Sequence, residues 1–263
     1  MQTLAQLNPL EPITAVPLFT WQVGPWLVTM SNHAFMVLVV AGFLMVSLPL
    51  AVRSPRLVPR GLQNFVESIC VYLREEMTRP LLGEQTDRYV GFLWTMFFFV
   101  LTLNLAGLIP TERIVTLFTG RRSYLGGVPT GNIFVTGTLG LIVFVMTHVY
   151  GIRRHGLWGY VAHLAPPTPR WLLPLMYPLE LLSISLRPFT MAIRLFANII
   201  SGHMVIATIL GLIFIFQQIG VAVVAVAASV ALSFLELLVA LLQAYILTFL
   251  CALYLGAATG TEH

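Results

Sequence analysis

The chain has 263 residues, of which 58% are hydrophobic and only 9% are charged. A water-soluble globule of this composition would lack the polar side chains that must cover its surface, so the composition indicates an all-α integral membrane protein. The net charge of +4 comes from fourteen arginines and no lysine, most of them between the apolar runs, which excludes a basic tract for nucleic acid.

The N-terminal segment, residues 1–32, is rich in proline and is expected to lie outside the membrane. Trp21 and Trp26 stand just before the first apolar run, a position typical of the aromatic belt at a membrane surface. The run over residues 33–52 is long enough, as a helix, to cross about 30 Å of hydrocarbon. No basic residue precedes Arg53, so a signal peptide is not indicated and this run is expected to remain as a membrane anchor.

Residues 62–82 place apolar side chains at the spacing of one helical face and carry charged residues at other positions. This pattern predicts an amphipathic helix that lies on the membrane surface. The second crossing is predicted over residues 89–109, where Pro110 ends it, and the third over residues 132–150. Residues 110–131, which contain several glycines, are expected to form a loop.

Two much longer apolar segments complete the chain, residues 174–216 and 221–256. As helices they would be about twice as long as a perpendicular crossing requires, so we expect a strongly tilted helical hairpin. A break of the first segment near Pro188 stays open as an alternative. The sequence therefore predicts one membrane domain over residues 1–263, with about five crossings and one surface helix.

Arginine counts predict the orientation of the chain. Loops 53–88 and 151–173 carry nine arginines, whereas loop 110–131 carries three and the N-terminal segment carries none. Because basic residues collect on the cytoplasmic side of membranes, the two richer loops are expected inside. The N-terminus is then outside and the C-terminus inside.

One edge of the first long segment is polar. Glu180, Arg187, Arg194 and Ser201 follow one another every seven residues, and seven residues return to within about 20° of the same helix face. Asn198 lies one turn beyond Arg194, close to that edge. An arginine at the centre of a bilayer costs about 2.5–3.5 kcal/mol even on lenient scales, so the position of Arg194 requires an explanation.

The second long segment carries Glu236 and Gln243, again seven residues apart. Folding the two segments as a hairpin about residues 217–220 brings Gln243 to the level of Arg194 and Glu236 to the level of His203. A buried acid and an imidazole at one level could form a hydrogen-bonded pair. Such a pair can pass protons near neutral pH, because imidazole titrates there.

Polar side chains inside a membrane often only hold helices together, and for a lone Asn or Gln we favour that interpretation. Four ionisable groups at compatible faces and levels, those of Arg194, Glu180, His203 and Glu236, instead indicate an ion or proton route. The other five histidines match no zinc-binding pattern, and the two cysteines lie in apolar surroundings. We therefore expect no metal, no cofactor and no disulfide.

Four stretches carry a resemblance to a known family: "RLFANIISGH" at 194–203, "PLELLSISLRPFTMAIRLFAN" at 178–198, "LELLVALLQAYILTFLCALYL" at 235–255 and "FVESICVYLREEMTRPLLGEQTDRYVGFLWTMFFFVLTLNLAGLIP" at 65–110. Together they resemble subunit a of the F-type ATP synthase, from about residue 31 to the end of the chain, and the arginine motif is highly specific to that family. One departure is "NIFVT", where Phe134 replaces an amide that the family often carries.

The resemblance implies a membrane stator beside a rotating ring of c subunits, each with one proton-carrying carboxylate. Arg194 would face the ring, favour the ionised carboxylate and block direct proton leakage between two offset half-channels. The access path from outside would run past His203 and Glu236, and an acid would stand on the exit side. The implied site residues are Arg194 at the ring, Glu236, His203, Asn198, Gln243 and Glu180 along the proton path, and Arg187, Ser201 and Asn132 as supporting candidates.

The resemblance also implies partners and a location. The partners would be the c-ring, the subunit b stalk, the other ATP synthase subunits and the lipid bilayer. The location would be a bacterial inner membrane or, alternatively, an organellar inner membrane. The chain itself is not expected to react with nucleotides, because a chain without lysine cannot carry the phosphate-binding loop G-x-x-x-x-G-K-[ST].

Two other functions would also account for part of the sequence. A proton-coupled secondary transporter is the alternative, and it would be expected to show two corresponding halves with matched broken helices. The sequence shows no such internal repeat. A purely structural subunit of a respiratory complex would explain the apolar composition, but not the paired levels of Arg194 with Gln243 and of His203 with Glu236.

Overall fold

The computed structural model describes residues 14–52, 60–109, 111–120, 126–163, 169 and 171–259, and the chain forms two compact units. The first unit comprises residues 1–42, 100–136 and 193–243, and the second comprises residues 43–99, 137–192 and 244–263. Each of the long helices contributes residues to both units, and the single membrane domain over residues 1–263 stays a prediction.

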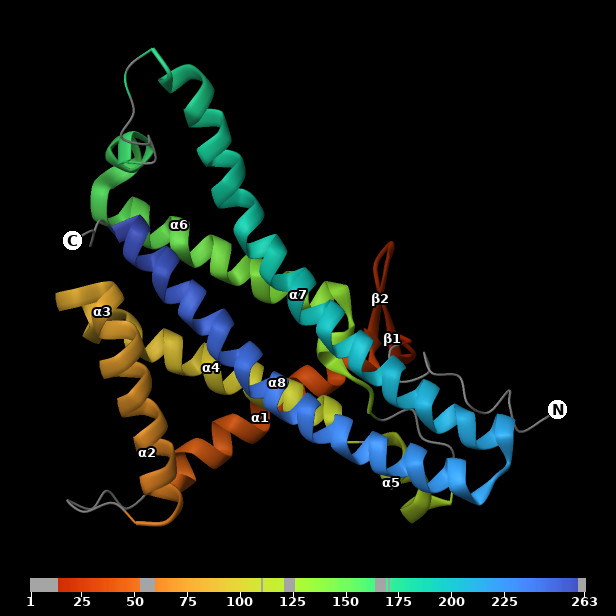
Figure 1. Ribbon diagram of the computed structural model, residues 1–263. Helices are drawn as coiled ribbons and strands as arrows, with labels where there is room; N and C mark the ends of the chain where they lie inside the picture. Colours follow the sequence, from red (N-terminus) through yellow and green to blue (C-terminus); the bar gives the residue numbers. More distant parts are fainter. Residues whose placement is uncertain are drawn as a thin grey trace. The chain divides into compact units, whose positions relative to one another are not determined.

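Helices make up almost all of the described chain (Figure 1). Five helical segments of the described part are long and apolar enough to cross a membrane, which confirms an all-α membrane protein with about five crossings. The elements are β1 Pro17–Val23, β2 Trp26–Ser31, α1 Asn32–Ala51, α2 Leu62–Tyr72, a π-helical turn Leu73–Thr78, α3 Arg79–Leu82, a 3₁₀ turn Gly83–Gln85, α4 Thr86–Leu108, α5 Thr111–Thr119, a 3₁₀ turn Pro129–Gly131, α6 Ile133–His163, α7 Leu173–Phe216 and α8 Ile219–Thr259.

A β-hairpin that the sequence analysis does not predict precedes α1 in the first unit. Strands β1 and β2 pair antiparallel around a two-residue turn, where Gly24 has a φ of 61° and Pro25 follows. The buried Asn32 side chain ties this hairpin to the helix, because its Oδ1 accepts hydrogen bonds from the backbone amides of Val16 at 3.1 Å and His33 at 3.0 Å. The hairpin is thus anchored at the first residue of α1.

The helical hairpin of the first unit is made by the end of α7 and the start of α8, which lie side by side (Figure 1). The turn occupies Gln217 and Gln218, within the polar break that the sequence indicates, and Gln217 has a φ of 50°. Small side chains on α8, among them Ala225, Ser229 and Ala240, are buried. Small residues let membrane helices approach closely, so they favour tight packing here.

Helix α7 is continuous from Leu173 to Phe216, through both Pro178 and Pro188. The break near Pro188 that the sequence left open is therefore not present. In the second unit, α6 comes very close to this helix, since a Cβ on Gly140 would lie only 2.7 Å from the carbonyl oxygen of Pro188. A glycine at 140 is what permits this close approach.

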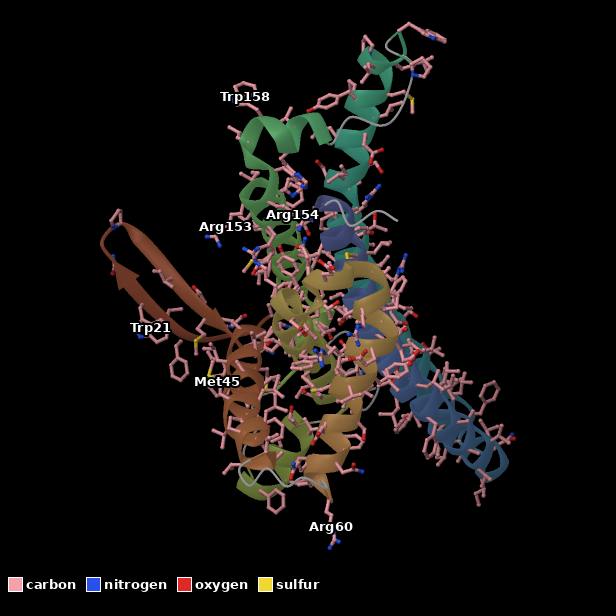
Figure 2. The ribbon with its side chains drawn as sticks, turned by 90° about the vertical axis from the view of Figure 1, so that its left-hand side faces the viewer. Trp21, Met45, Arg60, Arg153, Arg154 and Trp158 are labelled. Atoms are coloured by element: carbon pink, nitrogen blue, oxygen red, sulfur yellow. The ribbon has the colours of Figure 1, made fainter. Side chains whose placement is uncertain are left out.

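Helix α6 is longer than predicted. The prediction ends it at Tyr150, but the first helical break is at Gly156, which has φ 72° and ψ 168°. Gly151 packs instead of terminating the helix, because a Cβ there would lie 2.7 Å from Cδ2 of Tyr160 and 3.1 Å from the carbonyl oxygen of Ala258. The exposed arginines Arg153 and Arg154 continue the helix up to the break (Figure 2).

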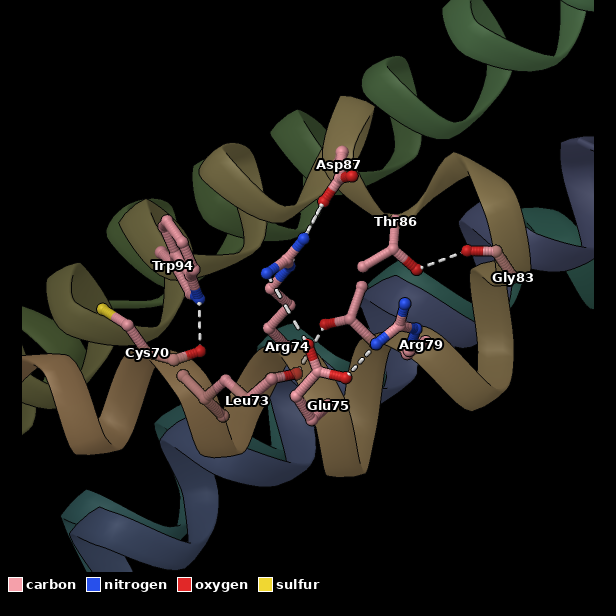
Figure 3. A network of polar contacts seen from close by, with 10 residues as sticks. Cys70, Leu73, Arg74, Glu75, Arg79, Gly83, Thr86, Asp87 and Trp94 are labelled. Carbon is pink, nitrogen blue, oxygen red and sulfur yellow. Dashed lines mark hydrogen bonds and ion pairs between the residues drawn. The ribbon is translucent and has the colours of Figure 1, made fainter.

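The predicted surface segment 62–82 is helical, with a π-helical turn over Leu73–Thr78. The Thr78 hydroxyl donates to the carbonyl of Leu73 at 2.7 Å, five residues earlier, which suits the wider π turn. Polar contacts then join this segment to the start of α4 (Figure 3): the Trp94 indole donates to the Cys70 carbonyl at 3.0 Å, and Arg74 pairs with Asp87 at 2.6 Å. Its location on a membrane surface remains a prediction.

The predicted loop 110–131 contains regular structure as well. Helix α5 occupies Thr111–Thr119, and a 3₁₀ turn covers Pro129–Gly131 just before α6. Gly127, with a φ of 105°, lies against the start of α1, because a Cβ there would be 2.9 Å from Nδ2 of Asn32. The loop therefore packs on the residue that anchors the N-terminal hairpin.

Candidate functional site

A cavity of about 140 Å³ lies in the first unit, between α7 and α8. Its polar lining consists of Asn198, Ser201 and His203 from α7 and Glu236 from α8, and the remaining lining is apolar apart from the backbone of Gly202. The cavity is large enough for several waters, since one water needs only about 10–15 Å³ of such volume. Two ionisable groups thus share a space that water can occupy.

The carboxylate of Glu236 lies directly against Gly202. A Cβ on Gly202 would overlap Oε1 of Glu236 and would lie 2.9 Å from its Cδ and 3.1 Å from its Cγ. A glycine inside a helix costs about 1 kcal/mol relative to alanine, so its presence in the middle of α7 calls for a local reason. The space that it leaves is the space the carboxylate occupies.

His203 lines the same cavity, but it does not bond to Glu236 directly. Its imidazole interacts with the backbone of Gly107 at the end of α4, and its Nε2 is buried without a hydrogen-bond partner among the described residues. The direct acid–imidazole hydrogen bond that the sequence allows is therefore not formed. The reason is that Gly202 gives the carboxylate of Glu236 a place against the α7 backbone instead.

Arg194 lies midway along α7 and is exposed on the first unit. It forms no hydrogen bond or ion pair within the described parts of the chain. Gln243, which the sequence predicts at the level of Arg194, is 5% exposed on α8, and no hydrogen bond joins the two side chains. A cation in a membrane span almost always finds a counter-charge or a polar cavity, and none of the residues that the structure describes supplies an ion pair or hydrogen bond to Arg194.

Arg187 differs from Arg194 in having its partner within the chain. In the second unit its guanidinium donates to Oε1 of Glu180 at 3.3 Å and stands 5.4 Å above the ring of Tyr254. The two paired side chains are seven residues apart, so the pairing follows from their common helix face. Glu180 and Arg187 thus form an ion pair within the second unit.

The remaining sequence candidate, Asn132, caps a helix. Its Oδ1 accepts a hydrogen bond from the backbone amide of Phe134 at 2.9 Å, at the start of α6. An asparagine in this position satisfies one of the free amides that every helix start presents. The structure therefore assigns Asn132 a local structural contact.

Asn104 is a buried polar residue that the sequence analysis did not select. It is fully buried on α4, its Nδ2 donates to the carbonyl of Ala240 at 3.4 Å, and its Oδ1 has no partner among the described residues. It shares a face of α4 with Leu108, four residues later, which lines the cavity. The available signal was a lone amide inside the predicted second crossing.

These features define the class of protein: a helical integral membrane protein whose one long helix carries an arginine with no partner among the described residues, with a histidine–glutamate cavity beside the next long helix. Within the described residues no group of His, Cys, Asp or Glu could hold a metal ion. A family model described as ATP synthase A chain matches residues 33–256. The chain belongs to this family, and the resemblance inferred from its motifs is confirmed.

Curated relatives named ATP synthase subunit a agree with this assignment. One from Chloroherpeton thalassium is 35% identical over 257 residues, which cover 96% of this chain and 73% of the relative. One from Anaeromyxobacter dehalogenans is 39% identical over 89% of this chain and 60% of the relative. One from Myxococcus xanthus is 40% identical over 79% of this chain and 65% of the relative. The chain thus spans between 60% and 73% of the length of these three relatives.

Replacing Gly202 with alanine is expected to displace the carboxylate of Glu236 while leaving the fold intact. The added methyl group would meet only the flexible end of a side chain, which can move, and alanine favours the helix. If the carboxylate carries protons, we expect transport to fall roughly tenfold or more, because a misplacement near 1 Å can cost about 100-fold. The measurement is ATP-driven acidification of inverted membrane vesicles.

Gly211→Ala is the matched control, because Gly211 lies on the same helix and a Cβ there would meet nothing within 4 Å. This variant is expected to transport protons at the parent rate. Equal transport by Gly202→Ala and Gly211→Ala would contradict a role for the position of the Glu236 carboxylate.

Proposed function

We propose that the chain is the proton-conducting stator subunit of an F-type ATP synthase and couples proton flow to rotation of a ring of c subunits. The observation that carries this proposal is the cavity lined by Asn198, Ser201, His203 and Glu236, on the same helix α7 that carries Arg194, an arginine for which the described part of the chain offers no partner. A proton path and a fixed cation beside it are the two parts that such coupling requires.

The cavity supports a role as part of the access half-channel. Because His203 and Glu236 do not bond directly, a proton would pass between them through water held in the cavity. Imidazole and carboxylate groups exchange protons readily when their environment brings their pKa values near the working pH. Asn198, which lines the cavity, would orient this water, and Gln243 would lie further along the path to the ring.

Arg194 would act at the contact with the ring. An exposed guanidinium in a membrane span is stabilised by a carboxylate on a neighbouring chain, and it favours the ionised form of that carboxylate. A ring carboxylate would therefore release its proton when it reaches Arg194. The ionised carboxylate could not return to the bilayer until a proton from the other half-channel neutralised it.

The ion pair of Glu180 with Arg187 supports a second, separate path on the exit side. The two half-channels must not overlap, since a continuous path would let protons cross without turning the ring. Each proton that falls through 100 mV releases about 2.3 kcal/mol, and the obligatory detour over the ring converts this free energy into rotation.

The partners would be the c-ring, the subunit b stalk and the remaining ATP synthase subunits, on which the nucleotide chemistry takes place. The chain would lie in a bacterial inner membrane with its N-terminus outside and its C-terminus inside. The bacterial relatives and the excess of arginine in loops 53–88 and 151–173 support this placement.

The proposal is tested with inverted vesicles from cells that make the complete complex and from cells that lack this chain. ATP should acidify the lumen of the first vesicles only, and a carbodiimide that modifies the ring carboxylate should stop it. Acidification by both kinds of vesicle would contradict the proposal. Proton uptake that depends on a solute gradient and not on ATP would instead indicate a secondary transporter.

A further inference from the structure

The N-terminal β-hairpin takes no part in the function proposed above, yet it presents an exposed apolar surface. We propose that this surface binds the layer of lipid headgroups at the N-terminal end of α1. The surface consists of Phe19, Trp21, Val28 and Met30 and is called the aromatic face below. The proposal does not depend on the proton path.

The strand register places these four side chains on one side of the hairpin. Phe19 pairs with Met30 and Trp21 pairs with Val28, whereas the pairs that alternate with them are Thr20 with Thr29 and Gln22 with Leu27. Successive side chains of a strand point to opposite faces, so the first two pairs share a face and the other two share the opposite one. One face is therefore wholly apolar, and the other is mostly polar.

The aromatic face is uncovered in the described structure. Phe19 and Trp21 are each 51% exposed and stack on one another with ring centroids 5.9 Å apart, and Val28 is 48% exposed. Figure 2 shows the Trp21 side chain pointing away from the hairpin. Tryptophan is enriched at the membrane–water boundary, because its ring is apolar and its N–H remains able to donate there.

The charge of the sequence favours lipid over a charged partner. Residues 12–52, which include the whole hairpin and α1, contain no Asp, Glu, Lys or Arg. A hairpin of this composition can enter the headgroup layer without removing any charge from water. A docking site for another protein would more often carry charged residues at its rim.

The anchoring of the hairpin places it at the membrane boundary. Asn32 is the first residue of α1, a span long and apolar enough to cross a bilayer, and it bonds to Val16 through both its backbone and its side chain. Both views show the hairpin turning aside from the axis of the first turns of α1 (Figures 1 and 2). If α1 crosses the membrane, a hairpin in this position runs along the membrane surface.

The backbone limits how deep the hairpin can lie. Two strands leave unpaired N–H and C=O groups along both outer edges, and such groups cannot be exposed to hydrocarbon. The aromatic face is therefore expected at headgroup depth, with its rings at the acyl boundary and the strand edges hydrated. This is the interfacial mode of binding rather than insertion.

The test uses the complete ATP synthase complex with Cys70→Ser and Cys251→Ser, reconstituted in vesicles of phosphatidylcholine and phosphatidylglycerol. Single cysteines are introduced by Phe19→Cys on the aromatic face and by Thr20→Cys on the opposite face as its matched control. Each is labelled with an environment-sensitive fluorophore. Val28→Cys and Thr29→Cys repeat the comparison on the other strand, so one variant that fails to assemble does not end the test.

Three quenchers then locate each label: iodide on both sides of the membrane, a lipid with a nitroxide at headgroup depth and a lipid with a nitroxide deep in its acyl chain. Labels at 19 and 28 should emit at shorter wavelength, be quenched most by the headgroup nitroxide and be protected from iodide. Labels at 20 and 29 should be quenched by iodide. Parent-level ATP-driven pumping shows that each variant is assembled.

Three results would overturn the proposal. Equal quenching by iodide on both faces would mean that the aromatic face lies in water. Protection from all three quenchers at positions 19 and 28 would mean that protein covers it, either another subunit or a second copy of this chain. Strongest quenching by the deep nitroxide would contradict the interfacial depth that the free strand edges require.

Discussion

Replacing Arg194 with alanine is expected to abolish ATP-driven proton pumping while the complex still assembles. Arg194 has no partner within the described chain, so the side chain is not needed to hold α7 against its neighbours. Removing an arginine from a membrane span also removes a cost of about 2.5–3.5 kcal/mol. Loss of function without loss of assembly is therefore the expected combination.

The measurement compares inverted vesicles that contain the parent complex, Arg194→Ala and Arg60→Ala. ATP-driven acidification should fall to the level without ATP in the first variant, with the ATP-hydrolysing subunits still bound in normal amount. Arg60 is exposed and lies before the helix α2, outside the long apolar helices, so its replacement controls for the loss of one arginine (Figure 2). Undiminished pumping by Arg194→Ala would mean that the arginine is structural, and the proposed coupling mechanism would have to be abandoned.

Replacing Glu236 with glutamine is the second substitution with a large expected effect. The amide has nearly the same shape, so the cavity and the contact with Gly202 should persist, but the group can no longer carry a proton. We expect proton transport to fall by about 100-fold or more, the range that a positioned acid–base group contributes. His203→Ala should show a similar loss, because its imidazole lines the same cavity.

Ser229→Ala serves as the control for both variants. Ser229 is a buried polar residue on α8 whose hydroxyl has no partner among the described residues, and it does not line the cavity. Its replacement should leave transport unchanged. The double variant His203→Glu with Glu236→His is expected to recover part of the rate, since both groups would still face one cavity. Parent-level activity in both His203→Ala and Glu236→Gln would return the two residues to a structural role.

The two arginines of α7 show what residue spacing can predict and what it cannot. The seven-residue interval predicts that Glu180 and Arg187 share a face, and in the structure they form an ion pair at 3.3 Å. The same interval places Arg194 on that edge, yet Arg194 has no described partner. Helix geometry determines the direction of a side chain, whereas its partner depends on which other chain or helix passes there.

For the cavity, too, the sequence predicts the level of the side chains but not their contacts. Counting outward from the turn at residues 217–220 predicts that His203 and Glu236 lie at one level, and both line the cavity. Their expected direct hydrogen bond is absent because Gly202 leaves room for the carboxylate, a fact about side-chain volume that a count of levels cannot include. Asn104 was missed for a related reason, since only packing shows that its face of α4 is directed to α8.

The membrane class, the long apolar helices and the polar edge of α7 were determined by the sequence itself, because they depend on composition and on the helical period, which are local properties. The N-terminal hairpin, the continuation of α6 to Gly156 and the placement of the Glu236 carboxylate were decided only by the tertiary structure. Each of these depends on a contact between residues far apart in the chain: Val16 with Asn32, Gly151 with Ala258, and Gly202 with Glu236. Local periodicity carries no information about such contacts, since they arise when elements pack and compete for space.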